Sequence, residues 1–134
     1  MSSALNSTNE RSLDEGWERV CRLQDLPFDA GVAALIRENS AEETQIALFR
    51  VADSDKVYAL CNRDPFSDAN VLARGILCGV GEKLAVASPI MKEHFYLENG
   101  QCLEAPEVFI ATYPVSVQGE DVYVRTTPAV AVAK

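Results

Sequence analysis

Residues Tyr58–Leu103 read YALCNRDPFSDANVLARGILCGVGEKLAVASPIMKEHFYLENGQCL, and this stretch carries the features that decide the fold. It contains two loops, Asn62–Ser67 and Ser88–His94, and each follows a short apolar run that predicts a strand. The second loop leads into a predicted hairpin whose turn is Asn99-Gly100, two residues that tolerate positive φ. The stretch therefore predicts two strand–loop units followed by a tight hairpin.

Short apolar runs separated by turn signals continue on both sides of this stretch. The predicted strands are residues 17–23, 31–37, 45–51, 56–61, 84–87, 94–98, 101–104, 108–117 and 121–125. We expect one turn of helix within 69–77, a reversal of direction at 78–81, and Pro114 at a sheet edge or bulge because it cannot donate a ladder hydrogen bond. Many short strands and no long helix predict an all-β fold, an antiparallel sandwich or small barrel.

Length and charge limit the classes of function. A chain of 134 residues predicts one domain, which we assign to 15–127 between a disordered tail at 1–14 and a second tail at 128–134. The net charge of −8, from 12 basic and 20 acidic residues, argues against nucleic acid as a partner. No apolar run is long enough to span a membrane, and the polar N-terminus does not resemble a secretory signal, so we expect a cytoplasmic protein.

The two loops, their spacing and the hairpins around them resemble the cluster-binding subdomain of Rieske iron–sulfur proteins, over roughly residues 17–125. In that family two loops each offer one Cys and one His to a two-iron cluster. Aligning the prolines places Asp64 and Ser88 at the cysteine positions and Phe66 and Met91 at the histidine positions. The resemblance implies a Rieske-like antiparallel fold whose cluster-binding subdomain is vestigial.

The replacements exclude the family's ligand set, because none of the four side chains supplies a thiolate or an imidazole. A shift of register does not restore the set: Cys61 would need a histidine at Arg63. Asp64 and Ser88 suit capping of the loops, since both side chains accept hydrogen bonds from nearby backbone amides. We therefore predict no metal and no cofactor in this chain.

The motifs NRDPFSDANVLARG and VASPIMKEHFYLENGQCLE closely resemble the small subunits of assimilatory NAD(P)H-dependent nitrite reductases, which are Rieske-like proteins without cluster ligands. In that family the large subunit carries flavin, an iron–sulfur cluster and sirohaem and reduces nitrite to ammonium. The resemblance implies that this chain is a non-redox subunit that docks on the large subunit and supports it. It also implies that the chain has no active site of its own.

Apolar side chains at both loop tips are the candidate interface with that partner. The candidates are Asp64, Pro65, Phe66, Ser67, Pro89, Ile90, Met91 and Lys92. One hypothesis has them exposed as a docking patch, and the other has Phe66 and Met91 turned inward to fill the space that the cluster left. Two further functions stay open at this point: a Rieske-type [2Fe-2S] ferredoxin that serves an oxygenase, and a module that binds a small ligand.

The remaining reactive residues predict no catalytic or metal site. His94 is the only histidine, and without a visible partner we expect it to be exposed or hydrogen bonded in its loop. The four cysteines, Cys21, Cys61, Cys78 and Cys102, include no Cys-x-x-Cys pair, so a zinc site is not expected. In a cytoplasmic protein we predict reduced thiols, with Cys61 and Cys102 as small core residues.

Overall fold

The computed structural model describes residues 16–52 and 56–129, and within them nearly all regular structure is β-strand. The strands are β1 (Trp17–Arg22), β2 (Gly31–Ile36), β3 (Thr44–Val51), β4 (Lys56–Cys61), β5 (Ile76–Val80), β6 (Lys83–Ala87), β7 (His94–Tyr96), β8 (Thr112–Tyr113), β9 (Val115–Gln118) and β10 (Asp121–Arg125). Two 3₁₀ turns, η1 (Leu23–Asp25) and η2 (Leu72–Arg74), join them. The predicted all-β class is confirmed.

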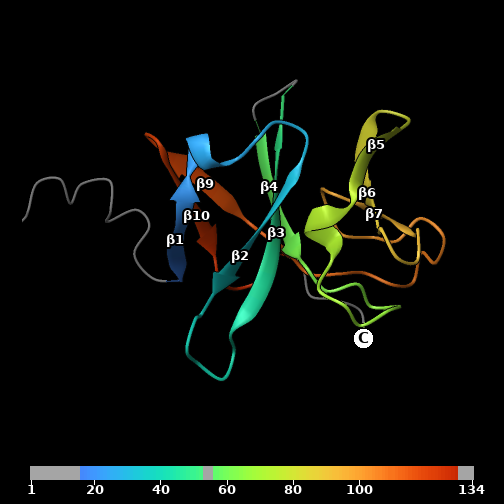
Figure 1. Cartoon of the computed structure of the whole chain (residues 1–134), viewed down its shortest axis with the longest axis horizontal. Helices are drawn as coiled ribbons and strands as arrows, with labels where there is room; N and C mark the ends of the chain where they lie inside the picture. The colour runs from blue at the N-terminus through green and yellow to red at the C-terminus, as the bar shows by residue number, and fades with distance from the viewer. Residues whose placement is uncertain (1–15, 53–55, 130–134) are drawn as a thin grey trace, which may run out of the picture.

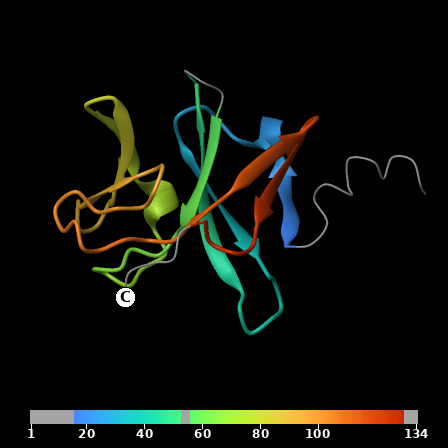
Figure 2. The same cartoon turned by 180° about the vertical axis from the view of Figure 1, so that it is seen from behind.

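Three antiparallel sheets lie in a row. The central sheet has the order β2-β3-β4-β8, the second has the order β1-β10-β9, and the small third sheet has the order β5-β6-β7. Figure 1 and the reverse view in Figure 2 both place β1, β9 and β10 on one side of the central sheet and the small sheet on the other. The small sheet and the two loops beside it form the subdomain that the Rieske resemblance predicts.

The central sheet is covered on both faces, which explains the continuous apolar run at Ile46–Phe49. Side chains alternate along a strand, so neighbours point to opposite faces. Ala47 and Phe49 belong to a core shared with the small sheet, whereas Ile46 and Leu48 belong to a core shared with β10. All four are fully buried. One pair of central strands therefore supports both halves of the molecule.

Most predicted strands are confirmed, and two local predictions are wrong. We predicted that 78–81 reverses the chain, but 78–80 lie within β5, and the reversal falls at the next two residues, where Gly81 has φ +65°. We predicted one strand over 108–117, but only its second half is strand. Pro114 divides this strand region in two: β8, before the proline, pairs with β4 in the central sheet, and β9, after it, pairs with β10.

The Asn99-Gly100 turn is present, with Gly100 at φ +79°, although the arm that follows it pairs only through isolated bridges. The predicted helical turn within 69–77 is the 3₁₀ turn η2. The predicted tail at 1–14 and most of the one at 128–134 lie outside the described residues. The last described residue, Ala129, donates its amide to the carbonyl of Thr112 over 2.7 Å.

The cysteines are all free thiols, as predicted, but only Cys102 is buried. Cys61 was expected in the core and is partly exposed instead, because it is the last residue of β4. Burial raises the pKa of the Cys102 thiol, and it likewise raises that of Cys21. Neither of the two 3₁₀ turns among the described residues has the length of a membrane span.

Candidate functional site

The two loops lie against each other, and a buried hydrogen bond joins them. The hydroxyl of Ser88, in the loop after β6, donates to Oδ2 of Asp64, in the loop after β4, over 2.5 Å. The two residues are 2% and 0% exposed. The bond connects the two positions at which the Rieske resemblance places cysteines. Sequence reasoning missed it, because spacing along the chain does not reveal how two side chains 24 residues apart are oriented.

Asp64 also holds the first loop in shape. Its Oδ1 atom accepts hydrogen bonds from the amides of Phe66 and Ser67, at 2.8 and 3.4 Å. Its carbonyl accepts the amide of Asp68 over 2.7 Å, and Asp68 has φ +66°. These are the local bonds by which a short polar side chain closes a turn.

Ser88 closes the second loop in the same pattern. Its hydroxyl oxygen accepts the amides of Ile90 and Met91, at 3.3 and 3.4 Å. Its carbonyl accepts the amide of Lys92 over 3.1 Å, and Lys92 has φ +71°. The predicted capping roles of Asp64 and Ser88 are therefore confirmed, and the loops are matched hydrogen-bonded turns.

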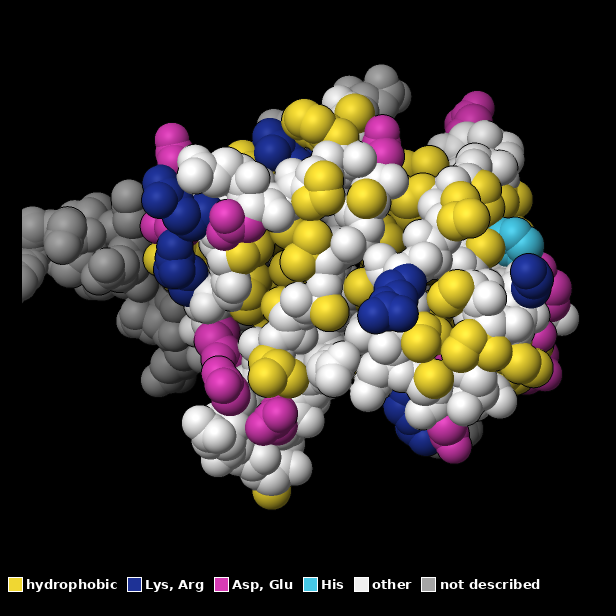
Figure 3. All heavy atoms as spheres, viewed as in Figure 1, with side chains coloured by type: hydrophobic (Ala, Val, Ile, Leu, Met, Phe, Trp, Pro, Cys, Tyr) yellow, Lys and Arg dark blue, Asp and Glu magenta, His cyan; other side chains and the backbone are white. Residues whose placement is uncertain are grey.

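Phe66 and Met91, the residues at the histidine positions, face outward. They are 39% and 44% exposed, and the neighbouring Ile90 is 48% exposed. The ring of Phe66 pairs with that of the buried Phe95, with 6.3 Å between ring centroids. Figure 3 shows hydrophobic side chains gathered over this end of the molecule, near the one histidine. The inward-facing hypothesis is not supported by these exposures.

Charged side chains border this apolar area. Arg63 and Asp68 form an ion pair at the first loop. Lys92 is exposed and forms no ion pair with the described residues. Seven of the eight candidate interface residues are exposed or partly exposed, and we call these seven the loop-tip surface: Pro65, Phe66, Ser67, Pro89, Ile90, Met91 and Lys92. Asp64, the eighth candidate, is buried beneath them and does not form part of this surface. The centre of the loop-tip surface is apolar and its border is charged, which is the composition of many protein interfaces.

The residues of the loop tips do not fit a two-iron Rieske cluster. Such a cluster needs two thiolates and two imidazoles. The positions offer instead a carboxyl, a hydroxyl, a phenyl ring and a thioether, and the first two bond to each other and to the loop amides. Within 16–52 and 56–129 no three His, Cys, Asp or Glu side chains are grouped to hold a metal ion.

His94 ends the second loop and is hydrogen bonded, as predicted, but its partner was not foreseen. Its Nδ1 atom lies 2.6 Å from Oε2 of Glu104, and its amide donates to Oε1 of the same carboxyl over 2.9 Å. Partial burial alone would raise the pKa of Glu104, but the hydrogen bonds and charge of His94 lower it below its ordinary value. The pair ties the end of the loop to the segment after the Asn99-Gly100 turn.

Comparison with known proteins agrees with this geometry. Residues 16–125 match the family model described as a Rieske-like [2Fe-2S] domain. The NADH nitrite reductase small subunit of Escherichia coli strain K12 is 35% identical over 109 residues, which cover 81% of this chain and 96% of that protein. The solution structure of the NAD(P)H nitrite reductase small subunit from Erwinia carotovora is 38% identical, with a TM-score of 0.70, and the match covers 90% of this chain and 88% of that one.

A further relative places the same domain in a longer chain. The NAD(P)H nitrite reductase large subunit of Klebsiella oxytoca is 39% identical over 108 residues, which cover 81% of this chain and 11% of that protein. The similarity thus extends over nearly the whole described domain in relatives of both kinds. From its fold, its loops and these relatives, the chain belongs to the Rieske-like family of nitrite reductase NAD(P)H small subunits.

Proposed function

We propose that this chain is the non-redox small subunit of a cytoplasmic NAD(P)H-dependent nitrite reductase, which reduces nitrite to ammonium in nitrate assimilation. The chain binds the catalytic large subunit through the loop-tip surface and supports the fold or activity of that subunit. The reaction takes place on the large subunit, with its flavin, iron–sulfur cluster and sirohaem. The chain itself holds no cofactor and has no self-contained active site.

One observation carries the proposal: the loops are closed by the Asp64–Ser88 hydrogen bond, while the residues next to it are apolar and exposed. A core would normally bury a phenylalanine, a methionine and an isoleucine. Here Phe66, Ile90 and Met91 are between 39% and 48% exposed on two hydrogen-bonded turns. An exposed apolar group of this kind, held in a fixed shape, is typical of a surface that another protein covers.

The relatives support the large subunit as that protein. The Escherichia coli relative is a separate small subunit, whereas the Klebsiella oxytoca relative contains the matching segment within a large subunit. A domain that is a separate chain in one enzyme and part of the large subunit in another is expected to contact the same neighbour in both. The acidic net charge of −8 is compatible with a protein partner and disfavours nucleic acid.

The test is binding to the co-expressed large subunit. Replacing Phe66 or Met91 with Asp puts a charge at the centre of the loop-tip surface, and we expect at least tenfold weaker binding for each, about the cost of losing one interface anchor. Val117, on β9 in the sheet at the other end, is 39% exposed like Phe66, so Val117→Asp is the matched control. Each variant is first shown to be folded by circular dichroism.

Equal binding by Phe66→Asp, Met91→Asp and the unchanged chain would exclude the loop-tip surface as the interface. A complex that survives these changes but is lost with Val117→Asp would move the interface to the opposite end. If the unchanged chain does not bind the large subunit at all, and nitrite-dependent NADH oxidation is the same with and without it, the proposed function itself is wrong.

A further inference from the structure

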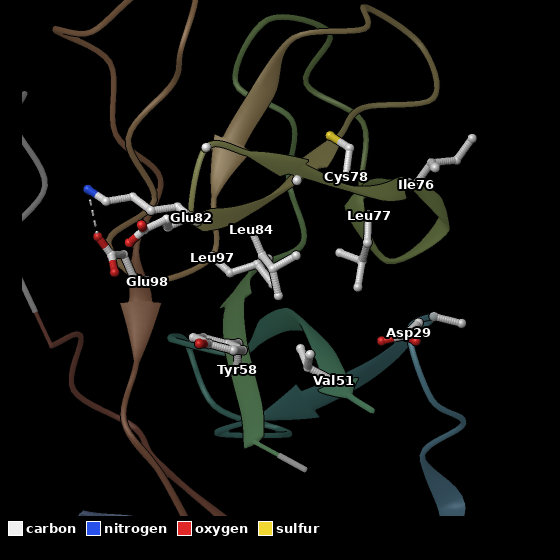
Figure 4. Close-up of a pocket in the computed structure, with 15 residues that line it drawn as sticks. Asp29, Val51, Tyr58, Ile76, Leu77, Cys78, Glu82, Leu84, Leu97 and Glu98 are labelled. Carbon is white, nitrogen blue, oxygen red and sulfur yellow. Dashed lines mark ion pairs between the residues drawn. The ribbon is translucent and has the colours of Figure 1, made fainter. Parts of the chain in front are cut away.

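A groove separates the small sheet from the central sheet, away from the hydrogen bond that joins the loops. Its volume is about 790 Å³. Figure 4 shows the side chains of Leu77, Leu84 and Leu97 pointing into it from one side, toward Val51 and Tyr58 on the other. The floor of the groove is therefore apolar and is supplied by both sheets.

Strand β5 forms one border of this groove and is an open edge. The sheet order β5-β6-β7 leaves β5 with a single neighbour. The hairpin closes with Val80 opposite Lys83, so in an antiparallel ladder alternate residues of β5 bond to β6, and Leu77 and Gly79 direct their amides and carbonyls outward. Neither backbone forms a hydrogen bond outside the sheet with any described residue.

The edge also lacks the features that prevent pairing with another strand. Edge strands are commonly protected by charged residues, proline or a bulge. β5 reads ILCGV, contains none of these residues, and pairs with β6 in an uninterrupted register. Ile76 is 74% exposed, and a Cβ atom built on Gly79 would meet nothing within 4 Å. In the described part of the chain nothing bonds the outward amides and carbonyls of this edge, so a second backbone can pair with them.

The charges around the groove indicate what kind of strand fits. Lys83 pairs with Glu98 over 3.1 Å. Asp29 and Glu82 also line the groove, are exposed, and form no ion pair with described residues. Among the residues that line the groove, the border therefore has a net negative charge. A second copy of this chain would present its own uncharged β5, so it would leave that charge unbalanced.

We propose that β5 is a docking edge for an extended segment of the nitrite reductase large subunit that carries apolar side chains and a Lys or Arg. The segment pairs with the backbone of Leu77 and Gly79, inserts alternate side chains into the groove, and places its cation near Asp29 and Glu82. This is the strand-addition mode of recognition, in which the backbone gives affinity and the pocket gives selectivity. The proposal rests on the proposed function for its partner and adds a second contact to the loop-tip surface.

The test uses the full chain in complex with its large subunit. Hydrogen exchange is measured for the β5 amides in the free chain at several concentrations and in the complex. We expect the amides of Leu77 and Gly79 to exchange rapidly in the free chain and at least tenfold more slowly in the complex. Gly79→Pro removes one outward donor, which is tolerated at a sheet edge, and should weaken binding about fivefold, as for one lost hydrogen bond.

Gly79→Ala is the matched control, because it keeps the amide and its Cβ enters open space. Glu82→Lys, which cancels the net negative charge of the border, should weaken binding even if Gly79→Pro disturbs the strand. The proposal is overturned if the complex forms without slowing either amide, and the loop-tip interface then stands alone. It is also overturned if the free chain already shows concentration-dependent protection, which would identify a second copy as the occupant. If the unchanged chain forms no complex, this proposal and the proposed function fail together.

Discussion

Ser88 contributes to the stability of the domain through a hydroxyl that serves both loops. Ser88→Ala would leave the buried Oδ2 atom of Asp64 without its donor, so we expect a loss of about 1–3 kcal/mol in the free energy of unfolding. Ser116→Ala is the control, because the half-buried hydroxyl of Ser116 accepts a hydrogen bond from the Gln118 side chain of the same strand and has no other partner among the described residues. Urea unfolding of both variants measures the difference, and an equal small loss would mean that the bond between the loops contributes little.

Tyr113, on β8, is expected to make the free energy of unfolding depend on pH in the alkaline range. Burial, followed by the neighbouring Cys61, raises the pKa of its phenol to about 12. In the unfolded chain a tyrosine ionises near pH 10, so between about pH 10 and 12 the unfolded state has lost a proton that the folded state keeps. We therefore expect the free energy of unfolding to fall by about 2 kcal/mol as the pH rises through this range.

Tyr113→Phe isolates this effect, because it keeps the ring and removes the ionisable group. Denaturant unfolding from pH 9 to 12 should show a smaller alkaline loss in the variant than in the unchanged chain. The same loss in both would assign the alkaline dependence to other groups.

Residue types were predicted more reliably than contacts. Asp64 and Ser88 were identified as loop caps from the sequence, because capping acts over two or three residues. Their bond to each other, and the bond of His94 to Glu104, were not predicted, since each needs the relative orientation of two distant backbones. The residues that cap the two loops were therefore predictable, whereas the hydrogen bonds between distant segments were not.

Among the turns that connect the strands, the Asn99-Gly100 turn requires glycine at its second position. Gly100 has φ +79°, and a Cβ atom there would lie 2.1 Å from the carbonyl oxygen of Ile110. Gly100→Ala therefore combines backbone strain with a clash against backbone that cannot move aside, and we expect it to cost more than 2 kcal/mol, about twice the strain alone.

Gly119→Ala separates the two causes. Gly119 has φ +64°, but a Cβ atom there meets nothing within 4 Å, so its cost should be about 1 kcal/mol, from strain alone. Thermal unfolding of the two variants gives the comparison. Equal costs would show that Ile110 moves aside.

Strands were predictable where their burial follows a simple pattern, and less so where a turn or a proline interrupts it. The pairing of β3 with β4 was read from two apolar runs around a short polar link. The strand β5 was not predicted, and the chain reversal was placed too early, at 78–81, because Gly79 resembles a turn residue although it lies in an extended edge strand. Pro114 was expected at an edge or bulge of a single strand, but it separates two short strands that belong to two different sheets.

At the scale of the whole molecule, two cores share β3 and β4, and the loop tips project from one end. If the loop-tip surface holds no cluster, the purified chain should be colourless. We expect no absorption band in the visible range and less than a tenth of an iron atom per chain by metal analysis. The ferredoxin alternative requires a brown protein with two irons. Anaerobic purification of the full chain, with a known Rieske ferredoxin as the positive control, decides between them.

The Asp64–Ser88 bond bears on how the domain folds after synthesis. In a Rieske protein the two loops are joined by a metal centre that must be delivered after synthesis. Here the two loops are joined by two side chains, which are present as soon as translation ends. If the chain holds no cofactor, as we propose, folding of the domain needs no iron, and we expect cells starved of iron or treated with a chelator to accumulate it in folded form.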